Sequence, residues 1–391
     1  MVPFQAPVDD ILFSLAHVAD TSGIDGFDLA LTAEIAAHFG AFAEGVLAPL
    51  NSDGDRQGAQ LENGRVRMPA GFHQAYRQYC EQGWPGLSIP EDYGGQGLGG
   101  VASGVVSEIF TGANHAFEMT CGLVPGAVRT ILDFGTKAQK AANIPQLASG
   151  EWLSTMALTE PGAGSDLSRI KCRATRSGQG WRIRGEKIFI SGGDQDLSDG
   201  ILHLVLARTS DDGVRGLSLF LCRSERADGT RNTVSVTRIE QKLGIHASPT
   251  CQLSFDDAEA ELIGEEGAGL RAMFTMMNHA RLAVALQGVA HASRATAVAR
   301  AYAEDRVQGK NTPISQHPDV ARMLDEMDLR AHGARGIAHL ALATLESGRA
   351  PELVELLTPV AKYFCTEVAS QAADLGIQVL GGSGSLEDYG M

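Results

Sequence analysis

The apolar residues of this chain change their spacing twice, and this change limits the possible folds more than any other feature. Residues 28–150 carry apolar residues at helical spacing between loops rich in Gly and Pro. From about Glu151 the spacing becomes two, in short runs such as ILHLVLAR and GLSLFLC. After ELIGEEGAGL the helical spacing returns, and residues 269–308 contain no Pro. This pattern predicts an α+β multidomain fold with a helical N-terminal domain, a central antiparallel β-barrel or sandwich, and a C-terminal helical bundle.

The expected boundaries follow the same changes. The helical N-terminal domain, with an N-terminal extension, covers residues 1–154. The central β-domain covers residues 155–264, and the C-terminal helical domain covers residues 265–391.

Charge and cysteine usage exclude several classes of function. The 32 basic and 47 acidic residues give a net charge of −15, which disfavours binding to nucleic acid or to an anionic membrane surface. The six cysteines lack CxxC spacing and are typical of reduced thiols in a cytosolic protein, so no metal site is predicted. Asp9 and Asp10 lie where a signal peptide needs basic charge, and no apolar run reaches the ~20 residues of a membrane span. We therefore expect a cytoplasmic protein without a membrane span.

The segment MALTEPGAGSD, residues 156–166, is the strongest candidate for chemistry. An apolar run leads into Pro161, Gly162, Gly164 and Ser165. Such a loop can offer backbone N–H groups and small hydroxyls to an anion or a heteroaromatic ring. On composition alone, an ordinary exit from a strand is the favoured explanation, because Gly-rich loops are common.

Further segments follow in a specific order: GEKIFISGG at 185–193, MMNHARLAVA at 276–285, EDRVQGK at 304–310 and QVLGGSG at 378–384. With these, the sequence resembles the acyl-CoA dehydrogenase family over essentially its whole length. The segments ANHAFEMTCGLVPGA and KLGIHASPTCQLSFDDA are most similar to those of the 3-methylmercaptopropionyl-CoA dehydrogenase subgroup.

The resemblance implies an FAD-dependent enzyme that introduces an α,β double bond into an acyl-CoA thioester. In the family a base removes the α-proton, and the β-hydrogen leaves as hydride to the flavin. The resemblance also implies an electron-transfer flavoprotein as acceptor and a homodimer or homotetramer as the assembly.

The resemblance assigns roles to individual residues. The residues matching cofactor contacts are Met156, Leu158, Thr159, Ser165, Phe189, Ile190, Ser191, Arg306, His317, Gln378, Gly381 and Gly382. The residues matching substrate contacts are Ser165, Asn278 and Arg281.

Several of these positions depart from the family or have a plain alternative. Phe189 replaces a Trp and loses its indole N–H, and Pro318 replaces a Gln that often touches the cofactor. The segment KIFIS could be a simple strand. Arg281 could be a solvated helix residue, although its apolar neighbours favour a buried or cleft position.

The catalytic base is the main departure, and no catalytic residue is predicted within the chain. The family's usual Glu is expected beyond Met391, and the alternative position is Ala280. Glu387 and Asp388 match a family loop that is acidic for other reasons. We therefore expect a C-terminal domain that is truncated relative to the family.

Two other functions remain open at this point. One is a non-catalytic subunit, or a fragment without a base, that binds FAD and CoA. The other is an acyl-CoA oxidase, which uses the same fold with O₂ as acceptor.

Overall fold

The structure is a computed structural model that describes residues 2–309 and 311–391. Its contacts divide the chain into two compact units. Unit 1 comprises Met1–Pro49, Gly99–His115 and Arg281–Met391, and unit 2 comprises Leu50–Leu98 and Ala116–Ala280. Each unit combines segments far apart in sequence, whereas the predicted division follows chain order. The predicted domain boundaries therefore stay a prediction.

Unit 1 is built mainly of helices. They are α1 (Val8–His17), α2 (Leu29–Phe42), the first part of α5 (Gly99–Cys121), α8 (Gly269–Asp305) from Arg281 onward, α9 (Pro318–Ser347) and α10 (Pro351–Leu380). Pro318 and Pro351 begin α9 and α10, because the first helical turn does not need their missing N–H.

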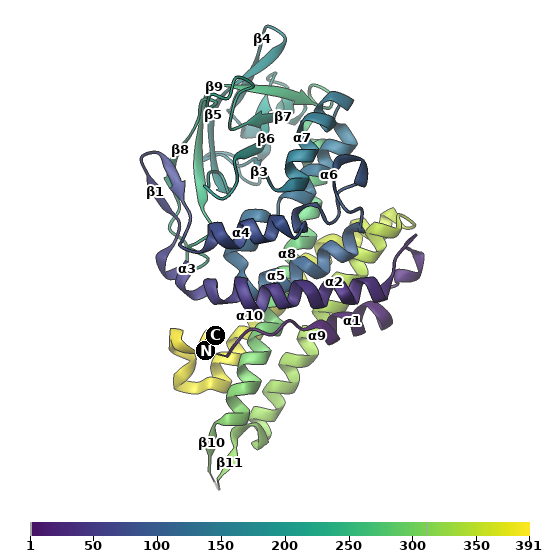
Figure 1. The fold of residues 1–391 in the computed structure, drawn as a ribbon, viewed down its shortest axis with the longest axis vertical. Helices are drawn as coiled ribbons and strands as arrows, with labels where there is room; N and C mark the ends of the chain where they lie inside the picture. The colour runs from purple at the N-terminus through teal and green to yellow at the C-terminus, as the bar shows by residue number, and fades with distance from the viewer. Residues whose placement is uncertain (1, 310) are drawn as a thin grey trace. The chain divides into compact units, whose positions relative to one another are not determined.

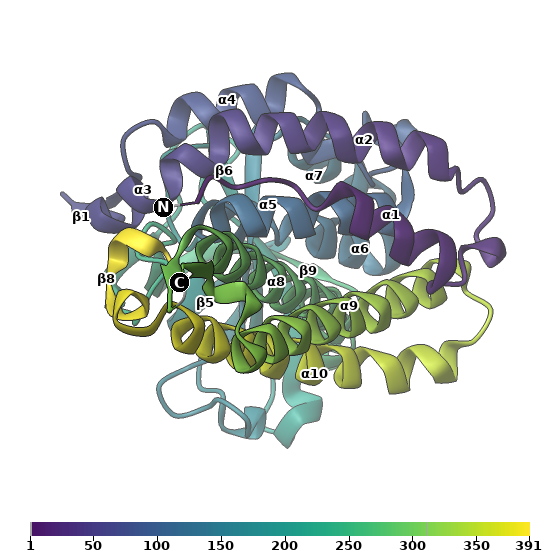
Figure 2. The same cartoon turned by 90° about the horizontal axis from the view of Figure 1, so that it is seen from below.

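The helices α9 and α10 lie side by side in unit 1 (Figure 2). A short hairpin, β10 (Val307–Gln308) and β11 (Thr312–Pro313), connects α8 to α9 (Figure 1). Aromatic packing supports the interior, where Phe39 meets Phe110 edge-on with ring centroids 5.5 Å apart.

Unit 2 combines short helices with a β-sheet. Its helices are α3 (Asn51–Gln57), α4 (Phe72–Glu81), α6 (Val124–Phe134) and α7 (Lys137–Ser149), with the ends of α5 and α8 that belong to this unit. Its strands are β1 (Gln60–Glu62), β2 (Arg65–Arg67), β3 (Trp152–Ala157), β4 (Arg173–Ser177), β5 (Gly180–Ser191), β6 (Gly200–Arg208), β7 (Leu217–Arg223), β8 (Val234–Ile239) and β9 (Thr250–Ile263).

The main sheet has seven strands in the order β3-β6-β4-β5-β9-β7, with β8 on β9. In this order, β4, β5 and β9 lie between β6 and β7. Because β6 also pairs directly with β7, these five strands close into a small barrel. The helices α6 and α7 contact β3 (Figure 1). The predicted central β-domain is confirmed.

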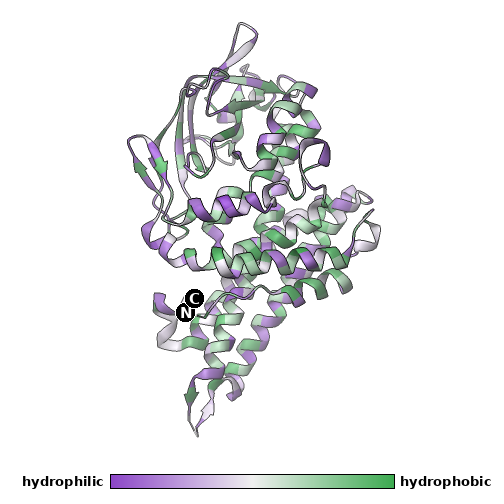
Figure 3. Ribbon diagram, viewed as in Figure 1, coloured by the Kyte–Doolittle hydropathy of each residue, from purple (hydrophilic) through white to green (hydrophobic). Residues whose placement is uncertain are grey.

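Two pairings in this sheet are parallel, β3–β6 and β4–β6, whereas the sequence predicts an antiparallel sheet. The chain leaves β3 through a long Gly-containing loop instead of a hairpin, so the next strands need not reverse its direction. All nine residues of β6 are buried, whereas four of the five residues of β4 are exposed. The turn between β4 and β5 is also hydrophilic (Figure 3).

Across the described residues, 2–309 and 311–391, no helix combines the length and hydrophobicity needed to cross a membrane. The same residues contain no group of three or more His, Cys, Asp or Glu arranged to hold a metal ion.

Candidate functional site

The loop after β3 is held in shape by its own backbone. The N–H of Glu160 donates to the carbonyl of Ala163 at 3.0 Å, and the N–H of Ala163 donates back to Glu160 at 3.0 Å. This closes a tight turn over Pro161 and Gly162. A Cβ placed on Gly162 or Gly164 would meet no described atom within 4 Å, so this face of the loop is open.

A buried ion pair ties this loop to β5. Lys187 is 0% exposed, and its Nζ lies 2.8 Å from Oε1 of Glu160 and 2.9 Å from the carbonyl oxygen of Leu158. Beside it, the N–H of Ile188 donates to the carbonyl of Thr159 at 2.9 Å. The structure therefore brings together two segments with predicted flavin contacts, 156–159 and 189–191.

Phe189 has an unusual backbone for an aromatic residue. Its φ is +61°, in the left-handed region that glycine favours, and the β5–β9 register shifts between Lys187 and Ile190. Its side chain is 60% exposed, whereas Ile190 is buried. The bulge thus turns an aromatic ring outward, as a plain strand would not, and strain of this kind collects at functional sites.

The remaining predicted residues near this loop present polar groups at its surface. Thr159 and Ser191 are half-buried, Ser165 is exposed, and Met156 and Leu158 are half-buried. An exposed ring, an open glycine loop and accessible hydroxyls suit a flat heteroaromatic cofactor bearing phosphate, so these residues fit the flavin expected from the sequence.

The two predicted substrate residues of α8 have different surroundings. Asn278, in unit 2, is exposed, and Arg281, in unit 1, is half-buried. Arg281 is thus neither a fully solvated residue nor a fully buried one.

A second group of predicted cofactor residues gathers at one end of unit 1. Arg306 precedes the β10–β11 hairpin, and His317 Nε2 lies 3.1 Å from the carbonyl of Gln308 in it. The other members, Gln378, Gly381 and Gly382, are exposed at the end of α10.

Tyr302 connects these two segments. Its hydroxyl lies 3.3 Å from Ser383 Oγ, and its ring meets Tyr389 edge-on at 5.6 Å. The structure therefore brings the hairpin and the segment after α10 into one neighbourhood.

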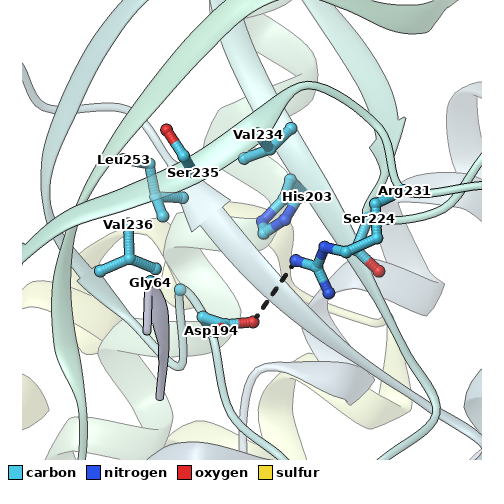
Figure 4. Close-up of a pocket in the computed structure, with 10 residues that line it drawn as sticks. Gly64, Asp194, His203, Ser224, Arg231, Val234, Ser235, Val236 and Leu253 are labelled. Carbon is cyan, nitrogen blue, oxygen red and sulfur yellow. Dashed lines mark ion pairs between the residues drawn. The ribbon is translucent and has the colours of Figure 1, made fainter. Parts of the chain in front are cut away.

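A small polar cavity lies elsewhere in unit 2 (Figure 4). Asp194 pairs there with Arg65 at 2.9 Å and with Arg231 at 3.8 Å. His203 lines the cavity, and its Nδ1 lies 2.8 Å from the Thr155 hydroxyl. The cavity volume of about 10 Å³ holds about one water molecule, so a thioester cannot bind there.

Family profiles match nearly the whole chain. The acyl-CoA dehydrogenase N-terminal domain matches residues 32–151, the middle domain residues 155–258 and the C-terminal domain residues 267–391. The 3-methylmercaptopropionyl-CoA dehydrogenase of Ruegeria pomeroyi is 42% identical over 99% of this chain and 71% of its own length. The chain belongs to the acyl-CoA dehydrogenase family.

Other acyl-CoA dehydrogenases agree with this assignment. The broad-specificity linear acyl-CoA dehydrogenase FadE5 of Mycobacterium tuberculosis is 33% identical over all of this chain and 70% of its own length. The crystal structure of the acyl-CoA dehydrogenase from Geobacillus kaustophilus superposes with a TM-score of 0.81, at 25% identity, covering 94% of this chain and 92% of that one.

Membership of the acyl-CoA dehydrogenase family makes this chain an oxidoreductase whose family cofactor is FAD. The predicted family, fold, enzyme class and cofactor are therefore confirmed. The individual site residues stay predictions.

The sequence alone did not predict that Glu160 and Lys187 form a buried ion pair at this site. Alternation along β5 buries Trp181, Ile183 and Lys187, and it breaks only after Lys187, where the register shifts before Ile190. A Cβ on Gly185 would lie 2.7 Å from the Cα of Cys172, and its φ of +143° is also one that glycine favours, so only glycine suits this contact. Strand alternation, which puts Lys187 on the same face as Trp181 and Ile183, was the available signal for Lys187.

Proposed function

We propose that this acyl-CoA dehydrogenase converts 3-methylmercaptopropionyl-CoA, or a fatty acyl-CoA, to the trans-2-enoyl-CoA. The observation that carries the proposal is the similarity to the Ruegeria pomeroyi enzyme along almost the entire chain. A broader range of linear acyl groups is the second candidate, because a broad-specificity relative also matches all of this chain.

In this proposal, residues from two strands orient the cofactor. FAD, when bound, supplies the hydride acceptor. The backbone of Met156–Thr159 and the Thr159 hydroxyl hydrogen-bond the edge of the ring, while Phe189, Ile190 and Ser191 flank it. Ser165 lies near the pyrophosphate, where its hydroxyl can donate a hydrogen bond. The exposed ring and the strained backbone of Phe189 support this assignment.

Asn278 and Arg281 contact the substrate in this proposal. Removal of the α-proton builds negative charge on the thioester oxygen, which hydrogen-bond donors stabilise. The base that removes this proton is best supplied by a carboxylate in a pocket without water, because burial raises the pKa of a carboxylate toward neutrality. Glu387 and Asp388 are exposed and Ala280 has no ionisable group, so none of the three is proposed as the base.

Arg306, His317, Gln378, Gly381 and Gly382 form a second cofactor contact in this proposal. Arg306 suits phosphate, because its planar guanidinium binds two oxygens at once. By the family's habit these contacts reach the FAD of another subunit, so we infer a homodimer or homotetramer. The Tyr302 contacts, which hold the two segments near each other, support the proposal that both segments contact the same cofactor.

The proposal includes an electron-transfer flavoprotein as acceptor and a cytoplasmic location. The six described cysteines are all free thiols, and five of them are buried, which suits a reducing compartment.

Anaerobic titration of the FAD-loaded protein tests the proposed reaction. Butyryl-CoA, 3-methylmercaptopropionyl-CoA and palmitoyl-CoA are added separately while the oxidised flavin absorbance is followed. Strongest bleaching with 3-methylmercaptopropionyl-CoA is the expected result. Equal bleaching by all three favours the broad-range alternative.

Two other results would point to different functions. FAD binding without bleaching by any thioester would favour a non-catalytic subunit or a fragment without a base. Stoichiometric peroxide production in air would favour an acyl-CoA oxidase. Gel filtration that gave a monomer retaining FAD would contradict the inferred oligomer.

A further inference from the structure

The Glu160 carboxylate is the centre of a small hydrogen-bonded network in unit 2. Its Oε1 accepts from Lys187 Nζ at 2.8 Å and from the N–H of Cys172 at 3.1 Å. Its Oε2 accepts from the N–H of Lys171 at 2.7 Å. One buried carboxylate therefore joins the loop after β3, the segment before β4, and strand β5.

Lys187 extends this network toward the proposed flavin contacts. Its ammonium also donates to the carbonyl of Leu158, so it fixes the backbone direction where β3 ends. The adjacent Ile188 N–H does the same at Thr159. Both bonds act on backbone groups of the segment proposed to meet the edge of the ring.

The same lysine anchors one side of the β5 bulge. Lys187 is fully buried on one side of Phe189, and Ile190 is buried on the other. Because Lys187 and Ile190 are both buried and only two residues lie between them, the strand bulges there, and Phe189 takes its positive φ with its ring outward. The ion pair thus supplies part of the force that maintains the strained conformation.

Stability alone does not account for this pair. Removing two charges from water costs about as much as their attraction returns, so well-packed apolar residues often stabilise a core equally well. A buried lysine that donates to one backbone carbonyl oxygen and one carboxylate oxygen does, however, specify one backbone geometry.

We propose that Lys187 and Glu160 are positioning residues that set the backbone of Leu158–Thr159 and the outward ring of Phe189 for the flavin. The proposal rests on the proposed function, because those two segments are its flavin contacts. Neither residue touches the cofactor in this account, and both act through the segments that they hold.

The test compares FAD binding and the visible flavin spectrum in four proteins. They are the parent chain, Lys187→Met, the double variant Lys187→Met with Glu160→Gln, and the control Arg184→Met. Arg184 lies on the same strand and pairs with Asp257 at 2.6 Å, but both side chains are exposed. The double variant leaves no unpaired buried charge, and the amide oxygen introduced by Glu160→Gln can still accept from the backbone N–H groups of Lys171 and Cys172, so it is expected to fold even where the single variant does not.

We expect the double variant to bind FAD about tenfold more weakly or worse and to shift the flavin absorption band, and the control to behave like the parent. A purely structural pair would leave the spectrum of bound FAD unchanged. Parental affinity and spectrum in a folded double variant would overturn this inference alone. Failure of the parent itself to bind FAD would overturn the proposed function and this inference together.

Discussion

Glu108 and Arg335 form an ion pair inside unit 1, with Arg335 Nε 2.9 Å from Glu108 Oε1 and both side chains at most 1% exposed. His339 completes the cluster, with Nε2 3.2 Å from the other carboxylate oxygen and Nδ1 2.9 Å from Ser14 Oγ. Burial by itself raises the pKa of Glu108, but Arg335 and His339 outweigh it and hold this pKa below its usual range. The cluster therefore ties α5 and α9 together through charge, and the Ser14 hydroxyl adds α1 through a hydrogen bond.

Substitution of Arg335 by Met should destabilise unit 1 strongly. The change leaves the Glu108 carboxylate buried without its cation, which typically costs about 3–5 kcal/mol of unfolding free energy. The control is Arg322→Met on the same helix, whose ion pair with Asp319 is exposed to solvent and therefore contributes little to stability. Urea unfolding measures both. Equal losses in the two variants would contradict a special role for the buried pair.

Acidification should weaken the fold through His203. Burial lowers the pKa of His203 to about 4 from 6.5, so the unfolded chain binds its proton first as the pH falls. The stabilisation is present in full above pH 6.5 and is lost as the pH falls toward 4, by about 3 kcal/mol.

The pH dependence of His203→Gln isolates this contribution. Burial also lowers the pKa of His115 to about 4, but that residue is present in both proteins and cancels in the comparison. We expect urea unfolding of the parent to lose more stability than the variant between pH 7 and 4. Parallel curves would mean that His203 does not titrate as the structure indicates.

Replacement of Phe189 by Gly should separate stability from function. Glycine adopts the +61° φ freely, and the exposed ring contributes little to the core, so unfolding free energy should stay level or rise by about 1 kcal/mol. FAD affinity should fall, because the proposed ring contact is lost.

Phe189→Leu is the matched control for that variant. It keeps a Cβ and therefore the backbone strain, but it removes the aromatic ring. We expect weaker FAD binding without a gain in stability, as measured by thermal melting and flavin fluorescence. A clear loss of stability in Phe189→Gly would show that the ring packs in the folded chain.

Substitution of Arg306 by Ala should weaken FAD binding about tenfold or more, since a charge-assisted hydrogen bond contributes about 1.5–3 kcal/mol. The salt dependence of FAD binding should also become flatter, because one phosphate contact by a cation is lost. Titration at two salt concentrations checks both effects. Arg322→Ala serves as the control, and an equal effect of that change would argue for general electrostatics.

The order and type of the elements followed from sequence pattern. The change from helical spacing to a spacing of two located the strands of the main sheet, and its reversal located the long C-terminal helices. The candidate loop at 156–166 was found from its glycines and hydroxyls. These features depend on residues that are close in sequence, so the sequence alone is enough to predict them.

The burial of charge was decided only by tertiary structure. Lys187 lies inside because of Glu160, 27 residues away, and Arg335 lies inside because of Glu108, 227 residues away. Alternation already puts Lys187 on the same face as Ile183, but the register shift between Lys187 and Ile190, which alternation cannot anticipate, turns Phe189 outward. A charged side chain can be buried at an acceptable energetic cost only where an opposite charge and hydrogen-bond partners compensate for the lost water. Because that partner comes from a distant segment, the sequence alone determined the elements and the family, and the folded arrangement determined which charges hold the site in shape.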